Sequence, residues 1–249
     1  MQPTIEIATT CTWFQRRLCW MMSSIISQMG DVPHIIFNVA YPSGNGDPST
    51  EDVCRFFKNR NLDIKETVYP DMETIQYRGL VRNRQLSETK ADWMIFTDCD
   101  MTYHPMFFDS LFPRIKSIGG HHDLFTAPRI SLNQEYCLKF FSEDKRSYPC
   151  FMEAAGRLEK WPVYEVSHPN SAGYFQMVNV ENMRSNFGGI YVNAEMCQDW
   201  SWEVGQWARS DRQFHKMIGG YQFLRGLPPQ YHLNHQRDKD CGHHITIQR

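Results

Sequence analysis

The sequence lacks long apolar runs and a strong net charge, and each absence excludes a class of protein. No apolar run approaches the roughly 18–20 residues that a membrane-spanning helix needs. Glu6 interrupts the first apolar stretch and no basic segment precedes it, which argues against a signal peptide. The net charge is −2, so the chain lacks the basic surface that binds nucleic acid. We therefore expect a cytoplasmic protein with no transmembrane segment and no nucleic-acid partner.

The cysteines form no recognisable metal or disulfide pattern. All eight are scattered along the chain without a C-x-x-C pair, which argues against a compact zinc site. No disulfide framework is evident, although a pairing of Cys150 with Cys197 or Cys241 stays open. Hydrophobic residues make up 41% of the chain, which is enough to bury a core and excludes a disordered chain.

Short apolar runs alternate with helical patterns in the first hundred residues. The runs predict strands over residues 4–8, 34–40, 62–68 and 92–97. The stretches between them predict a helix over 13–29, a second that Ser49 or Thr50 caps and that ends at Phe57, and a third that reaches Lys90. This alternation predicts an α/β fold with a mainly parallel sheet and helices on both faces.

The second half of the chain is less regular. Residues 129–171 mix charges, prolines and aromatics without a clear period, and we interpret them as an insertion beside the sheet. We expect a strand over 173–180, a helix over 211–218, a strand near 221–224 and a polar, histidine-rich tail from 231. No internal repeat or low-complexity linker divides the chain, so residues 1–249 are predicted to form one domain.

The clearest local signal is the pair of carboxylates in Asp98-Cys99-Asp100, directly after the fourth predicted strand. Residues two apart on a strand point the same way, and the carboxyl ends of parallel strands form the crevice where such sheets bind ligands. Two adjacent carboxylates repel each other unless a cation such as Mg²⁺ or Mn²⁺ lies between them. A lone D-x-D also occurs in solvated loops, so its neighbours decide how it is interpreted.

The neighbours of this motif resemble GT-A glycosyltransferases. The segment from Gly79 to Met101 is similar to their helix–strand–DxD segment, particularly in the large inverting family that also resembles cellulose- and chitin-synthase catalytic domains. Arg82 and Asn83 stand at that family's Arg-Asn positions, and Asp92 stands where it commonly has glycine. The resemblance implies a GT-A, Rossmann-like fold with a mixed, mainly parallel sheet flanked by helices. Nucleotide-sugar binding would fall in residues 1–101, and acceptor binding and catalysis in 102–249.

The resemblance continues in the second half. The helix start at Ser210-Asp211 resembles the family's Glu-Asp pair, which implies that Asp211 is the general base. Ser210 replaces the usual Glu, and an Asp in this position is also an ordinary helix-start residue. The segment from Gly173 to Gly189 resembles the one that closes over the donor sugar, although an ordinary strand and turn would have the same pattern.

The resemblance also suggests metal and donor ligands. GT-A enzymes commonly place a histidine ligand after the last core strand, and the run that begins at His235 is similar to the metal-histidine segment of β-1,4-galactosyltransferase-like enzymes. Mn²⁺ or Mg²⁺ would then be held by Asp98, Asp100 and His235, with His232 as the second choice. The implied donor contacts are Thr9, Thr10, Arg16, Arg82, Asp98 and Gly173.

The function that this resemblance implies is sugar transfer from a UDP- or GDP-sugar to a carbohydrate or other hydroxyl acceptor, with inversion. A retaining GT-A enzyme and a non-catalytic sugar-nucleotide-binding scaffold remain as alternatives. A nucleotidylyltransferase would need a glycine-rich phosphate loop, and residues 9–17 contain no glycine. A zinc hydrolase is disfavoured because the tail histidines lack an HExxH framework.

Overall fold

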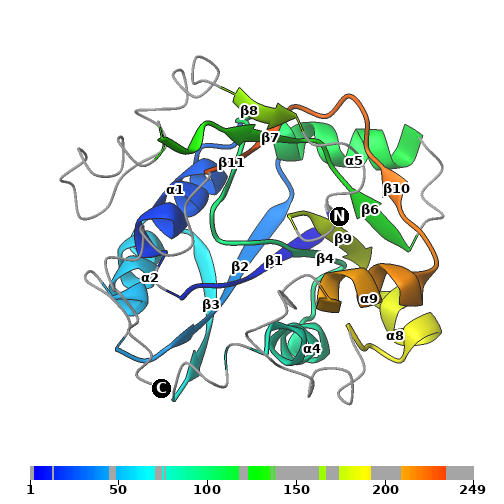
Figure 1. Cartoon of the computed structure of the whole chain (residues 1–249), viewed down its shortest axis with the longest axis horizontal. Coiled ribbons are helices and arrows are strands. Elements are labelled where there is room, and N and C mark those ends of the chain that lie inside the picture. The colour runs from blue at the N-terminus through cyan, green and yellow to red at the C-terminus, as the bar shows by residue number, and fades with distance from the viewer. Residues whose placement is uncertain are drawn as a thin grey trace.

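The computed structural model describes residues 3–12, 14–44, 49–70, 75, 77–117, 123–135, 137, 163–166, 174–191 and 209–233. In this part of the chain, a central seven-stranded sheet lies between two layers of helices, and a four-stranded sheet adjoins it (Figure 1). Within the same residues, no helix is both long enough and apolar enough to cross a membrane.

The central sheet has the order β10-β6-β9-β4-β1-β2-β3. The four predicted N-terminal strands are present and pair in parallel: β1 (Thr4–Thr10), β2 (His34–Pro42), β3 (Asp63–Tyr69) and β4 (Trp93–Phe96). The other three strands are β6 (Leu124–Thr126), β9 (Gln176–Asn179) and β10 (Gln222–Phe223). β9 runs antiparallel to both its neighbours, β4 and β6, which confirms the predicted mixed, mainly parallel sheet.

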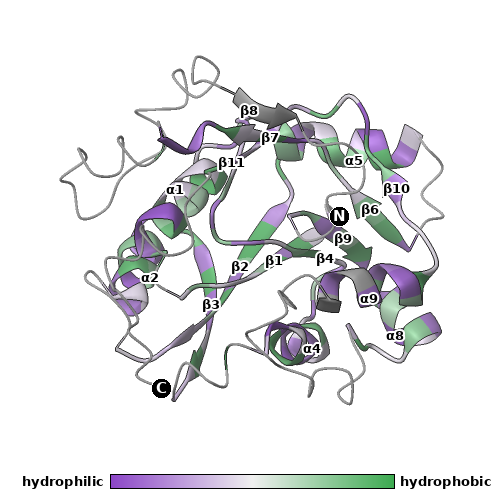
Figure 2. Ribbon diagram, in the orientation of Figure 1, coloured by the Kyte–Doolittle hydropathy of each residue, from purple (hydrophilic) through white to green (hydrophobic). Residues whose placement is uncertain are grey.

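Helices cover both faces of this sheet because its strands are apolar on both sides. One layer contains α1 (Gln15–Ile26), α2 (Thr50–Lys58) and α5 (Phe107–Ser117), and the other contains α4 (Arg78–Glu88), α8 (Val180–Phe187) and α9 (Arg209–Ile218). Alternate strand residues enter the two cores: Ile7 and Ile95 pack with the first layer, Ala8 and Phe96 with the second. Apolar residues are accordingly frequent along the strands in Figure 2.

Two helix ends differ in how well the sequence predicted them. The Ser49 side chain accepts a hydrogen bond from the backbone N–H of Asp52, and the Asp52 side chain accepts one from the backbone N–H of Ser49. Ser49, and not Thr50, is therefore the cap of α2. The strand expected over 173–180 is shorter, because a helix that was not predicted, α8, begins at Val180. The Asn179 side chain accepts a hydrogen bond from the third residue of that helix, and Gly188 ends it in the left-handed conformation.

The smaller sheet has the order β5-β11-β7-β8, with strands β5 (Met101–Tyr103), β11 (Gln230–His232), β7 (Arg129–Leu132) and β8 (Val163–Val166). No strand was predicted in residues 129–171, so β7 and β8 are differences from the expectation. Strands of three or four residues are too short for their alternation to stand out in the sequence. β5 directly follows Asp100, and the backbone N–H of Leu233 donates to the carbonyl oxygen of Asp100 at 2.9 Å.

Candidate active site

Asp98 and Asp100 lie where the central sheet passes into the smaller one. Asp98 comes two residues after β4, and Asp100 directly precedes β5. The Asp98 side chain keeps 28% of its surface exposed, whereas that of Asp100 keeps 8%. Burial raises the pKa of Asp98, and the charge of Asp100 adds to this rise while two nearby arginines oppose it. A cation at this position would therefore stabilise the charged carboxylates.

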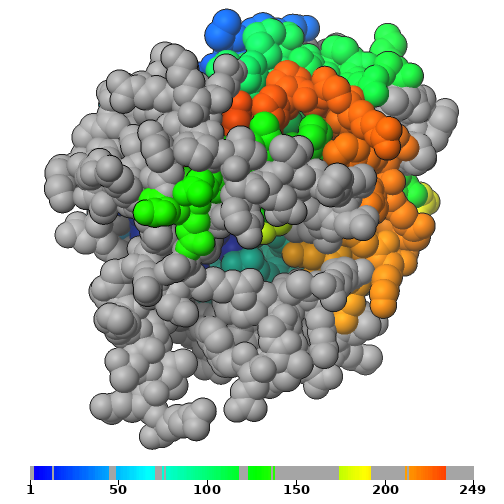
Figure 3. All heavy atoms as spheres, turned by 45° about the horizontal axis from the view of Figure 1, so that its top comes forward, coloured from blue at the N-terminus to red at the C-terminus, as the bar shows by residue number. Residues whose placement is uncertain are grey.

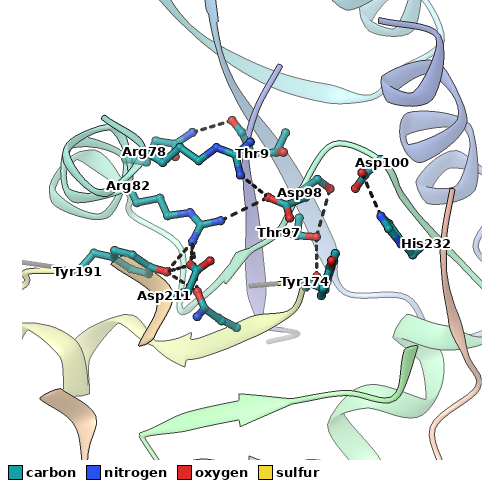
Figure 4. A network of polar contacts seen from close by, with 12 residues as sticks. Thr9, Arg78, Arg82, Thr97, Asp98, Asp100, Tyr174, Tyr191, Asp211 and His232 are labelled. Atoms are coloured by element: carbon teal, nitrogen blue, oxygen red, sulfur yellow. Dashed lines mark hydrogen bonds and ion pairs between the residues drawn. The ribbon is translucent and has the colours of Figure 1, made fainter. Parts of the chain in front are cut away.

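Arg78 and Arg82 approach Asp98 from α4 (Figure 4). The two are one helical turn apart and so lie on the same face. Nη1 of Arg78 lies 3.2 Å from Oδ1 of Asp98, and Nη2 of Arg82 lies 3.9 Å from the same oxygen. Arg78 keeps 31% of its side chain exposed and Arg82 only 4%. Arg78 is therefore the one that a ligand can reach from solvent.

Arg82 also contacts Asp211, the predicted base, on the first turn of α9. Nη1 of Arg82 donates to Oδ1 of Asp211 and, at 2.5 Å, to the hydroxyl oxygen of Tyr191. The same nitrogen lies 3.4 Å from Oε1 of Gln176. Burial disfavours a charged guanidinium, but Tyr191, Asp211 and Asp98 outweigh it and raise the pKa of Arg82. One buried cation thus lies between Asp98 and Asp211.

Asp100 contacts His232, which lies on the strand next to β5 in the smaller sheet. Oδ2 of Asp100 lies 3.2 Å from Nε2 of His232, and the side chain of His232 is 10% exposed. The register of β11 against β5 places His232 opposite Met101, which brings the last residue of β11 beside the carboxylate pair. The second-choice histidine is therefore the one that the described structure places next to Asp100.

Tyr174 and Arg129 lie next to His232 and form, together with it, one wall of the site. The ring of Tyr174 lies 4.9 Å from that of His232, centroid to centroid, and Cζ of Arg129 lies 3.5 Å from the centre of the Tyr174 ring. Arg129 pairs with Gln230 on the neighbouring strand, so Arg129 and His232 lie on the same face of the smaller sheet. Thr97 Oγ1 donates to the carbonyl oxygen of Tyr174 at 2.8 Å, which ties this wall to the carboxylate turn.

The donor contacts predicted around the end of β1 lie at the same edge of the central sheet as Asp98. Thr9 and Thr10 end β1, and the carbonyl oxygen of Thr9 accepts a hydrogen bond from Gln85 of α4 at 3.3 Å. Arg16 is half-buried in the first turn of α1. Its neighbour Arg17, which was not predicted, donates from Nε to the carbonyl oxygen of Leu233 at 3.2 Å and so connects α1 to the end of β11.

Some predicted residues cannot be placed. Gly173 and His235 lie outside the described residues, as do Cys150, Cys197 and Cys241. The site residues that were missed are Arg78, Arg129, Tyr174, Gln176 and Tyr191. Arg78 had a signal in the sequence, because it precedes Arg82 by one helical turn, and Tyr174 and Gln176 lie in the segment that resembles the one closing over the donor sugar. Figure 3 shows a face on which teal, green and orange segments, far apart in the chain, appear together.

The described residues fit a divalent cation only in part. Among them, no group of three or more His, Cys, Asp or Glu side chains is arranged to hold a metal ion. Asp100 and His232 nevertheless offer one oxygen and one nitrogen ligand at a single point. Such a pair suits a cation that takes its remaining ligands from a diphosphate and from water.

Comparison with known proteins identifies the fold. No family model matches the sequence, and no curated protein is significantly similar to it. Among solved structures, TarS 1–349 from S. aureus matches with a TM-score of 0.60 and 13% identity, over 92% of this chain and 60% of that one. The same protein with UDP-GlcNAc matches with a TM-score of 0.58 and 13% identity, over 99% and 61% of the two chains.

A second neighbour is a mannosyltransferase. The mannosyltransferase PcManGT from Pyrobaculum calidifontis, in complex with GDP-Man and Mn²⁺, matches with a TM-score of 0.51 and 14% identity, over 92% of this chain and 55% of that one. The chain therefore has the GT-A-like fold of these proteins. It spans about 60% of the length of the TarS fragment.

Proposed function

We propose that this chain, which has the GT-A-like fold, is a glycosyltransferase that moves a sugar from a nucleoside-diphosphate sugar to a hydroxyl acceptor. The solved structures that share its fold include complexes with UDP, UDP-GlcNAc and GDP-Man. A UDP- or GDP-sugar is therefore the proposed donor. The acceptor would be a carbohydrate or another molecule with a free hydroxyl.

The observation that carries this proposal is the position of Arg82 between two carboxylates. One edge of its guanidinium faces Asp98 of the DxD motif, and the other donates to Asp211 on α9. A transferase needs its base close to the anomeric carbon of a donor whose diphosphate lies at the DxD motif. Two residues from distant parts of the chain, proposed for these two roles from sequence alone, lie on either side of one side chain.

The proposed reaction is a single displacement. Asp211 takes the proton from the acceptor hydroxyl, whose oxygen attacks the anomeric carbon of the donor sugar. The bond from that carbon to the diphosphate oxygen breaks, and the nucleoside diphosphate leaves with the bonding electron pair. Because attack and departure occur on opposite faces, the product has the inverted anomeric configuration. NMR of the product would separate this course from retention.

Two arginines, one on each side of the carboxylate turn, would stabilise the negative charge of the leaving group. Arg78 is partly exposed beside Asp98, and Arg129 lies against Tyr174 on the other side. Asp100 and His232 would hold a divalent cation, with His235 as a further predicted ligand and Asp98 beside it. When bound, this ion supplies charge that neutralises the departing diphosphate. An imidazole ligand suits Mn²⁺ better than Mg²⁺, because Mg²⁺ prefers oxygen.

The experiment that tests the function measures release of nucleoside diphosphate. Purified chain is incubated with UDP-GlcNAc or GDP-mannose, with Mn²⁺ or EDTA, first with water as acceptor and then with a panel of mono- and disaccharides. We expect metal-dependent release from one donor class, faster when the correct acceptor is present. Binding of a donor without release under any of these conditions would favour the non-catalytic scaffold.

A further inference from the structure

A tyrosine that the sequence did not single out lies against the proposed base. Tyr191 is fully buried, and its hydroxyl oxygen lies 2.6 Å from Oδ1 of Asp211 and 2.5 Å from Oε1 of Gln176. The same oxygen accepts a hydrogen bond from Arg82. Burial raises the pKa of Tyr191 well above its usual value, although Arg82 opposes this, so the hydroxyl keeps its proton. That proton is available to Asp211 or to Gln176.

The elements that carry Arg82 and Asp211 also fix the position of this tyrosine. The backbone N–H of Tyr191 donates to Oδ1 of Asn83, which follows Arg82 in α4, at 2.6 Å. The Tyr191 ring stacks on Phe214, one turn after Asp211 in α9, with centroids 4.1 Å apart and an interplanar angle of 20°. Contacts with both helices therefore hold Tyr191 beside Asp211.

Both donors reach the same oxygen of the base. Arg82 and the Tyr191 hydroxyl each contact Oδ1 of Asp211. Two buried donors on Oδ1 restrain the carboxylate of Asp211, and a base restrained in this way would take the acceptor proton on its other oxygen, Oδ2. A general base must lie within hydrogen-bond reach of the proton it removes, so the direction of that second oxygen matters for the rate.

We propose that Tyr191 is a positioning residue that, together with Arg82, holds Oδ1 of Asp211 and so directs Oδ2 toward the acceptor hydroxyl. This inference rests on the proposed function, because it gives Tyr191 a role only if Asp211 is the base. It also gives the consecutive residues Arg82 and Asn83 a shared role. Arg82 donates to the hydroxyl of Tyr191, and Asn83 accepts from its backbone N–H.

The test compares Tyr191→Phe with the unaltered chain. The variant keeps the ring that stacks on Phe214 and loses only the hydroxyl. With UDP-GlcNAc or GDP-mannose and Mn²⁺, we expect kcat for nucleoside-diphosphate release to fall about ten- to a hundredfold. The KM for donor and the donor-induced rise in Tm should stay the same, because Tyr191 contacts the base and not the carboxylate turn. Tyr221→Phe, which removes a hydroxyl from a ring beside His215 on α9, is the matched control and should retain its kcat.

The outcomes separate this inference from the function beneath it. An unchanged kcat in Tyr191→Phe, while Asp211→Asn loses turnover, would overturn the positioning role and leave the proposed base intact. An equal loss of donor binding and of kcat would also overturn it, because it would indicate a general structural role. Full turnover in Asp211→Asn would remove the base assignment, and with it the role of Tyr191, while leaving sugar transfer itself in place.

Discussion

Nε2 of His232 lies 3.2 Å from Oδ2 of Asp100, between neighbouring strands of the smaller sheet. The contact depends on β11, the last strand among the described residues, which pairs with β5 on one side and with β7 on the other and so returns to the carboxylate turn. It joins the Asp98-Cys99-Asp100 motif, the clearest signal in the sequence, to His232, which the sequence ranked behind His235 as a metal ligand. The metal site proposed above is built on this contact.

Replacement of His232 by Gln tests that site. We expect the Mn²⁺ concentration for half-maximal donor binding to rise at least about tenfold, because one of the two described ligands is lost. The measurement is a Mn²⁺ titration monitored by the donor-induced shift in Tm. His34→Gln is the control, since His34 is exposed and pairs with Asp63 on the surface. An unchanged Mn²⁺ requirement in His232→Gln would instead favour His235 as the ligand.

Asp211→Asn tests the general base. The amide keeps the size of the side chain but cannot take a proton, so we expect kcat to fall by about a hundredfold or more. The donor-induced rise in Tm should persist, because the donor diphosphate is proposed to lie at Asp98 and Asp100. Steady-state rates and thermal shifts on the same preparation check both parts. Turnover within a few-fold of the unaltered chain would contradict the assignment and favour a retaining course.

Arg129→Met tests whether Arg129 helps to bind the diphosphate. The change removes a buried charge from the face of Tyr174 and should weaken binding of the nucleoside diphosphate about tenfold or more. Arg60→Met is a matched control, because Arg60 also lies over an aromatic ring, that of Phe56, at 3.6 Å, but is exposed at the end of α2. Equal affinities of UDP or GDP for the two variants, measured by calorimetry, would remove Arg129 from the site.

Glu6→Gln tests a buried polar network in the central sheet, around β1. Glu6 is fully buried and accepts hydrogen bonds from Asn38 at 2.6 Å, Thr89 at 2.8 Å and Lys65 at 3.0 Å. Loss of the charge leaves a buried network incompletely satisfied and should cost about 2–3 kcal/mol. We expect Tm to fall by roughly 5–10 °C.

The control for this prediction is Glu88→Gln. Glu88 pairs with Arg84 one turn away on the exposed face of α4, where ion pairs contribute little. Its Tm should change by no more than about 1–2 °C, given the small worth of such pairs. If both variants melt at the same temperature, the Glu6 network does not stabilise the fold.

The first four strands could be predicted from sequence because their signals are local. Each is a short apolar run, and stretches with a helical pattern separate one run from the next. Asp98 comes two residues after the last of these strands. The departure at Asp92, where the family that this segment resembles commonly has glycine, has a reason that is seen only in the fold. Its side chain accepts a hydrogen bond from the backbone N–H of Thr4, at the start of β1, at 2.7 Å.

The parts that could not be predicted depend on tertiary contacts. Tyr191 has no distinguishing neighbours in the chain, and its place is set by packing on Phe214 and by the side chain of Asn83. Arg129 and His232 lie on strands of four and three residues, too short to show a period, and only the register of β7 with β11 brings them to one face. The sequence therefore identified the carboxylates of the site more readily than the side chains that orient them.

The central claim, metal-dependent binding of a nucleoside-diphosphate sugar, is tested most directly by thermal shift. Purified chain is melted with UDP-, GDP-, CMP- or dTDP-linked sugars, each with Mn²⁺, Mg²⁺ or EDTA. We predict that a UDP- or GDP-sugar at about a hundred times its Kd raises Tm by roughly 5–10 °C with Mn²⁺ and does not do so with EDTA. A folded sample that shows no shift with any donor and metal would contradict the account.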